Sequence, residues 1–147
     1  MDAAFLLRRG LVALVGLGLS GTLVELSILR HWTNPQEFVP WVVLILAGVI
    51  TGFLAFRPSP RVVRTATIAG LVLASAGVYG ACIHIAANMN AAVLDGTVGP
   101  TWDALPLWRQ LWMASTGGVG PPPALAGGAM APTGLALALA TLAHPDA

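Results

Sequence analysis

The chain has 147 residues, of which 56% are hydrophobic and only 9% are charged. Soluble domains carry about 25% charged residues, so this composition excludes an ordinary soluble protein and indicates an integral membrane protein. The formal net charge of +1 excludes nucleic-acid binding as a main role, because such binding depends on many contacts between basic residues and phosphates. The single cysteine, Cys82, excludes an internal disulfide and a multi-thiolate metal site.

Four apolar stretches are long enough to cross a bilayer, whose hydrocarbon core of about 30 Å requires roughly 20 helical residues. They cover residues 11–29, 38–56, 65–88 and 124–143, and Glu25 is the only formally charged residue within them. The first stretch is too long for the apolar region of a cleaved secretory signal, so we expect it to be retained. The sequence therefore predicts an all-α fold, a single bundle of four transmembrane helices.

The connection between the third and fourth spans contains a further amphipathic helix, predicted over residues 103–115. Asp103 is its expected N-cap, Pro106 falls in the first turn, and Gly117 ends the helix. Its apolar side chains follow helical spacing, as is typical of a helix that lies in the membrane interface. Such a helix either covers its own bundle or docks on a neighbouring subunit, and the predicted contact residues are Trp102, Leu105, Trp108 and Trp112.

The distribution of arginine predicts the orientation, because basic residues in short loops stay on the cytoplasmic side. Five of the seven arginines fall on one side of the predicted bundle, and Arg30 and Arg109 fall on the other. All five tryptophans lie on this second side, which suits the preference of indole for the headgroup layer. We expect a bacterial inner-membrane protein with both termini cytoplasmic and residues 93–123 outside.

Small residues recur at helical spacing on two of the predicted spans. They are Gly70, Ala74, Gly77 and Ala81 on the third span, and Gly127, Ala131, Gly134 and Ala138 on the fourth. Small residues let helix backbones approach closely in lipid, so we expect the first, third and fourth spans to be in close contact. Pro132 removes a helical hydrogen bond and predicts a kink in the fourth span.

The few polar groups of the spans continue these stripes of small residues. Glu25 continues a series with Gly18 and Gly21 on the first span, and His84 and Asn88 extend the stripe of the third. A polar group in hydrocarbon requires a partner, so we predict a buried polar link formed by Glu25, His84 and Asn88. His31 and His84 could alternatively provide the two imidazoles of a haem site, although His31 also fits a simple interfacial position.

The sequence contains no recognisable catalytic arrangement. It holds no serine–histidine–acid set and no zinc-binding histidine pair, and the only match to a dinucleotide fingerprint, at residues 16–21, lies inside a predicted membrane helix. We therefore expect a protein that is not an enzyme, with no intrinsic cofactor and no metal site. A transport pathway is the weakest alternative, because the second and fourth spans offer almost no polar residues.

Three stretches carry a resemblance to a known group of proteins. They are GTLVELSILRHWTNPQEFVP from Gly21 to Pro40, GVYGACIHIAAN from Gly77 to Asn88, and APTGL followed by HP near the C-terminal end. Together they resemble a group of small uncharacterised four-helix bacterial integral membrane proteins. The resemblance implies a four-helix membrane fold and gives weight to Glu25, His31, His84 and Asn88, but it implies no particular activity.

These observations favour an accessory subunit of a larger bacterial energy-transducing complex, either a photosynthetic reaction-centre and antenna complex or a respiratory one. Its expected partners are other membrane subunits and lipids, with lipid, quinone or pigment bound at the interface. The alternatives are a haem- or quinone-handling redox protein that uses His31, His84 and Glu25, and a small transporter.

Overall fold

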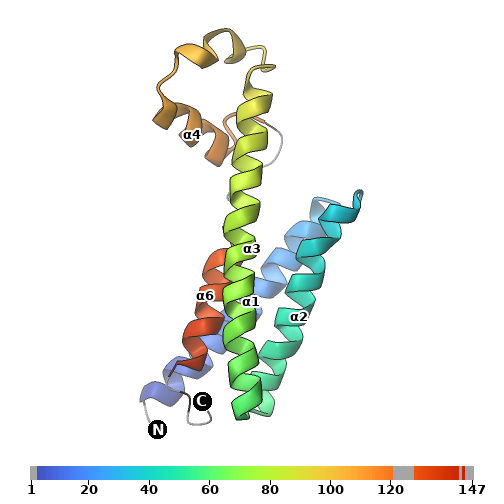
Figure 1. Ribbon diagram of the computed structural model, residues 1–147, viewed down its shortest axis with the longest axis vertical. Coiled ribbons are helices and arrows are strands. Elements are labelled where there is room, and N and C mark those ends of the chain that lie inside the picture. Colours follow the sequence, from blue (N-terminus) through green and yellow to red (C-terminus); the bar gives the residue numbers. More distant parts are fainter. Residues whose placement is uncertain (1–2, 121–127, 143, 145–147) are drawn as a thin grey trace. The chain divides into compact units, whose positions relative to one another are not determined.

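The structure is a computed structural model that describes residues 3–120, 128–142 and 144. Its regular elements in these ranges are all helices (Figure 1). The chain forms two compact units, one made of Met1–Ala76 with Ala129–Ala147 and the other of Gly77–Gly128. The two units are described separately below.

The first unit contains the long apolar helices that the sequence predicts. Helix α1 covers Ala3–Ile28, α2 covers Phe38–Phe56, and α3 covers Pro60–Ala92, with its first part in this unit. The bounds of α2 are those predicted, whereas α1 and α3 extend beyond the apolar stretches. All three helices are long and apolar enough to cross a membrane.

The fourth predicted span is shorter in the structure. Helix α6 covers Met130–Thr141, which is 12 residues or about 18 Å of helix. Residues 124–127 and 143 of the predicted span lie outside the described residues. Pro132 is in the first turn of α6. The kink predicted at this proline concerns the part of the span before α6, most of which lies outside the described residues.

Helices α3 and α6 approach each other backbone to backbone at two glycines. A Cβ atom added to Gly70 would lie 2.7 Å from both the Gly134 carbonyl oxygen and the Ala138 amide nitrogen. A Cβ atom at Gly134 would likewise clash with the Ala74 amide nitrogen and the Gly70 carbonyl oxygen. The Thr67 and Thr141 hydroxyls add a hydrogen bond of 2.7 Å between the same two helices. The predicted small-residue contact of these helices is confirmed at these positions.

Helix α1 packs against both α2 and α6 in the same unit. The side chain of Thr133 fills the space above Gly18, so a Cβ atom at this glycine would clash with it. The core residues come from all four helices of the unit and are Val15, Leu19, Leu44, Ala47, Leu54, Val63, Ala66, Leu73, Met130 and Leu137. The predicted close contact of the first, third and fourth spans therefore holds within the described part of this unit.

The turn between α1 and α2 is held by several short hydrogen bonds. Arg30 adopts a left-handed conformation with φ 50°, and the next amide, that of His31, donates to the Leu26 carbonyl oxygen at 3.0 Å, as in a Schellman helix end. The Trp41 indole N–H then donates to the His31 carbonyl oxygen at 2.7 Å. The Glu37 carboxylate accepts a bond of 2.6 Å from the Thr33 amide.

The second unit contains the end of α3, the 3₁₀ helix η2 at Gly99–Ala104, and α4 at Leu107–Thr116. The sequence correctly predicts a short helix that ends at Gly117, which has φ 78°. The predicted N-cap at Asp103 is wrong, because this residue belongs to η2 and Pro106 is the N-cap of α4. A proline fits there because the first amide groups of a helix have no helical acceptor.

Candidate docking site

Four buried residues form the core of the second unit. They are Ala92, Trp102, Ala114 and Val119, and Ile85, Met89, Val98, Leu105 and Met113 pack around them. The Gln110 side-chain amide donates to the carbonyl oxygens of Trp102 at 2.9 Å and Leu105 at 3.2 Å. This amide therefore fixes the start of α4 against the preceding segment.

Asn88 is fully buried and connects α3 with the end of α4. Its side-chain Nδ2 donates a hydrogen bond of 2.9 Å to the Ala114 carbonyl oxygen. The carbonyl groups of the last turn of a helix have no helical donor, so this bond satisfies one of them in α4. Gly120, with φ 78°, packs so closely on Asn88 that a Cβ atom there would clash with the Asn88 side chain.

The face of α4 that points away from this core is apolar and aromatic. Trp108 is 69% exposed and Trp112 66% exposed, and they lie one turn apart. Leu107 and Leu111 form a parallel exposed row beside them. The inward positions belong to smaller or more polar residues, namely Gln110, Met113 and Ala114. We call the exposed set Leu107, Trp108, Leu111 and Trp112 the α4 face.

The structure separates the four predicted contact residues into two pairs. Trp108 and Trp112 are on the exposed α4 face, whereas Trp102 is only 4% exposed and Leu105 packs against the same core. A side chain buried in its own unit cannot form the surface that a partner contacts. Trp102 is therefore a core residue, and Leu105 is partly buried against the same core. The contact role of the four residues stays a prediction, for which the exposed Trp108 and Trp112 are the available pair. Leu107 and Leu111, which the prediction did not include, are also on the exposed face.

The predicted polar link involves residues of both units. Glu25 is half-buried on α1 in the first unit, and His84 and Asn88 are on α3 in the second. The link between them and the pairing of His31 with His84 at a haem stay predictions. The structure adds that the Asn88 side chain donates a hydrogen bond to α4. Helical spacing within α3 does not predict this bond, because the acceptor, Ala114, is 26 residues further along the chain.

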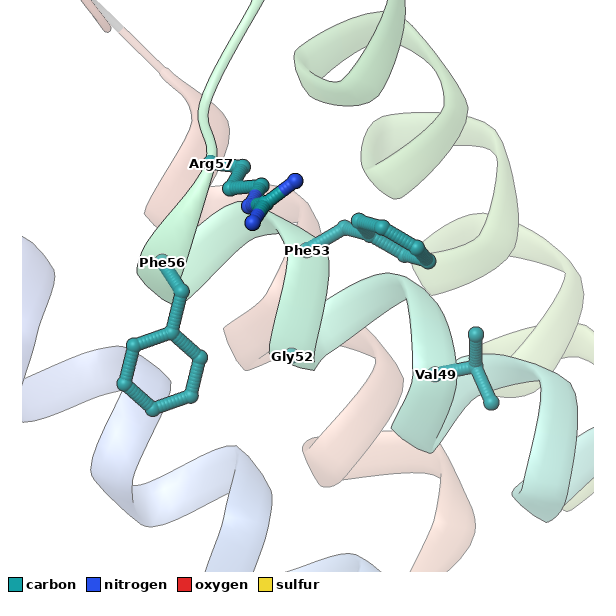
Figure 2. Close-up of a pocket in the computed structure, with 5 residues that line it drawn as sticks. All are labelled: Val49, Gly52, Phe53, Phe56 and Arg57. Carbon is teal, nitrogen blue, oxygen red and sulfur yellow. The ribbon is translucent and has the colours of Figure 1, made fainter.

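The described residues contain no group of three or more histidine, cysteine or acidic side chains arranged to hold a metal ion. The residues described by the structure do contain an open groove at the end of α2, lined by Val49, Gly52, Phe53, Phe56 and Arg57 (Figure 2). This groove belongs entirely to the first unit.

Comparisons of the chain with protein-family models, curated proteins and solved structures found no match. The similarity to small four-helix bacterial membrane proteins therefore stays a hypothesis based on the three stretches quoted above.

Proposed function

We propose that this protein is a non-enzymatic accessory subunit of a larger bacterial energy-transducing membrane complex, photosynthetic or respiratory, and that the α4 face is its contact with a larger membrane subunit. The observation that carries this proposal is the outward orientation of Trp108 and Trp112. The unit completes its own core with Trp102, so these two indoles are not needed to fold it.

The Asn88–Ala114 hydrogen bond supports a position for α4 at the membrane surface. The apolar run of α3 ends where Asn88 and Asn90 appear in the sequence, as expected where a helix leaves the hydrocarbon core. Because Asn88 bonds directly to the end of α4, that end is at the same level. The α4 face would then be at the height of the headgroup layer, where neighbouring subunits of a membrane complex also expose their surfaces.

The composition of the α4 face supports a protein partner. Tryptophan and arginine are enriched among residues that dominate binding energy, and Arg109 lies exposed in the same helix. Burial of one large apolar side chain contributes roughly 1.5–3 kcal/mol, so a partner that covers the four residues of the face gains substantial binding energy. Lipid headgroups are the other occupant that this face could accept, and the experiments below separate the two.

We place both termini in the cytoplasm and residues 93–123 outside, in the bacterial inner membrane. The arginine asymmetry supports this orientation. In such a complex, the exposed apolar sides of α1, α2 and α3 would contact lipid, quinone or pigment and the neighbouring subunits.

Purification of the protein from its native membrane in a mild detergent tests the accessory role. Mass spectrometry of the purified material should identify larger membrane subunits in a fixed ratio to this chain. An absorption spectrum of the isolated chain tests the alternative role, because haem bound by His31 and His84 would give a Soret band. A chain that purifies alone and carries such a band would contradict the proposal.

A further inference from the structure

The groove at the end of α2 combines an apolar floor with one cationic side chain. Its lining residues are Val49, Gly52, Phe53, Phe56 and Arg57, and they enclose an open space of about 230 Å³. Apart from Phe56, they are spaced by three, four or eight residues from Val49 and so lie along one side of the helix. The groove follows the helix for about 12 Å from Val49 to Arg57.

The glycine creates the space in the groove. A Cβ atom added to Gly52 would meet no atom within 4 Å, so nothing else in the described chain fills the position beside it. Figure 2 shows the Arg57 side chain reaching back over the last turn of α2 toward Phe53. Phe56 points to another side of the helix and is 87% exposed.

The groove is at the end of a helix that can cross the membrane. Helix α2 ends at Phe56, and the segment after it contains Arg57, Arg61 and Arg64, which mark the predicted cytoplasmic side. Among the residues that the structure describes, none gives the Arg57 guanidinium a hydrogen bond or an ion pair. A cation at this depth faces the phosphate layer of the inner leaflet, and guanidinium binds phosphate oxygens in bidentate geometry.

We propose that this groove binds one anionic membrane phospholipid, with its phosphate at Arg57 and one acyl chain along Val49, Gly52 and Phe53. Charge complementarity determines the headgroup, because the only charged side chain lining the groove is positive. The direction of the groove determines the position of the chain, since a transmembrane helix and the acyl chains beside it run roughly parallel. The site does not depend on the accessory role, because all five lining residues belong to this chain and to one unit.

Native mass spectrometry of the full chain in detergent tests this site. The protein is mixed with phosphatidylglycerol or with phosphatidylcholine of the same acyl chains, and the bound lipid is counted. One arginine near the membrane surface favours an anionic lipid by about fivefold, so we expect that preference in the unchanged protein. Arg57→Gln should remove the preference, Arg57→Lys should keep most of it, and the control Arg9→Gln should leave it intact.

A second pair of variants tests the acyl-chain part of the groove. Gly52→Leu should lower the binding of both lipids several-fold, because the new side chain would occupy the groove from a position where a Cβ atom meets no atom within 4 Å. Gly10→Leu is the matched control on α1, since a Cβ atom there also meets no atom within 4 Å. Circular dichroism and gel filtration confirm that each variant is folded. Full preference for phosphatidylglycerol in folded Arg57→Gln, or equal lipid binding by Gly52→Leu and Gly10→Leu, would overturn the proposal.

Discussion

The Asn88 side-chain amide donates a hydrogen bond of 2.9 Å to the Ala114 carbonyl oxygen and so connects α3 with the last turn of α4. The two residues are 26 positions apart, and both are fully buried. Ala114 is also part of the buried core of this unit. With Ala114 against α3, the two tryptophans of the α4 face are directed outward.

Replacement of Asn88 should release the end of α4. In Asn88→Leu, the buried Ala114 carbonyl oxygen loses this donor. An unsatisfied buried polar group lowers the free energy of unfolding by about 1–3 kcal/mol. We expect a lower unfolding temperature and faster amide exchange over residues 107–116. Asn90→Leu is the control, because Asn90 is exposed on the same helix. Equal exchange of α4 in the two variants would show that the bond does not hold this helix.

Gly70 allows the closest approach of α3 and α6. In Gly70→Ala, the new methyl group would be 2.7 Å from two backbone atoms of α6, so the helices must separate, at a cost of about 1–3 kcal/mol. Gly80→Ala is the matched control on α3, where a Cβ atom meets nothing within 4 Å. Alanine favours a helix over glycine by roughly 0.5–1 kcal/mol, so the control should be neutral or stabilising. Thermal unfolding in detergent measures the stability of both variants. A Gly70→Ala protein that is more stable than the unchanged protein would refute the close packing of α3 and α6.

The loop after α3 should depend on pH through Asp95. A hydrogen bond from the Thr97 hydroxyl, with further bonds from the amides of Val98 and Thr97, holds the pKa of the Asp95 carboxyl below its usual value. The stabilisation that the ionised Asp95 carboxylate contributes is therefore complete above the pKa of this group in the unfolded chain. It is lost as the pH falls through the lower pKa of Asp95 in the folded protein. The unfolding temperature of the unchanged protein should exceed that of Asp95→Asn at neutral pH, and the difference should shrink in acid. A difference that grows on acidification would have the wrong sign.

Reporter fusions test the orientation. Alkaline phosphatase is active only outside the cytoplasm, so a fusion at Gly99 should be active and one at Ser59 inactive, because the arginines beside Ser59 hold that connection in the cytoplasm. The reverse pattern would invert the topology.

Hydropathy is sufficient to predict α2, because a helix surrounded by lipid is apolar on every side and ends where polar residues begin. The glycine contact of α3 and α6 is predictable for a related reason, since small residues at helical spacing have few other uses in lipid. The start of α4 is less predictable, because Asp103 and Pro106 are both acceptable near a helix N-terminus. Tertiary contacts of Gln110 with the preceding segment accompany the observed start.

The candidate site is harder to predict from the sequence than the helices are. Trp102, Trp108 and Trp112 are the same residue type within 11 positions, and their spacing does not reveal which one enters the core. That choice depends on packing with Ala92 and Val119, which are distant in the sequence. The hydrogen bond of Asn88 is equally hard to predict, because its acceptor is a backbone carbonyl oxygen, which every residue type has.

The most direct test of the accessory role is co-purification of the variant Trp108→Ala/Trp112→Ala with the native membrane complex. Trp32→Ala is the control, because Trp32 is an exposed indole on the same predicted side of the membrane. We expect the double variant to insert at normal levels but to lose its larger partner subunits, while the control retains them. Unchanged co-purification of the double variant would contradict the account and leave the α4 face as a contact with lipid.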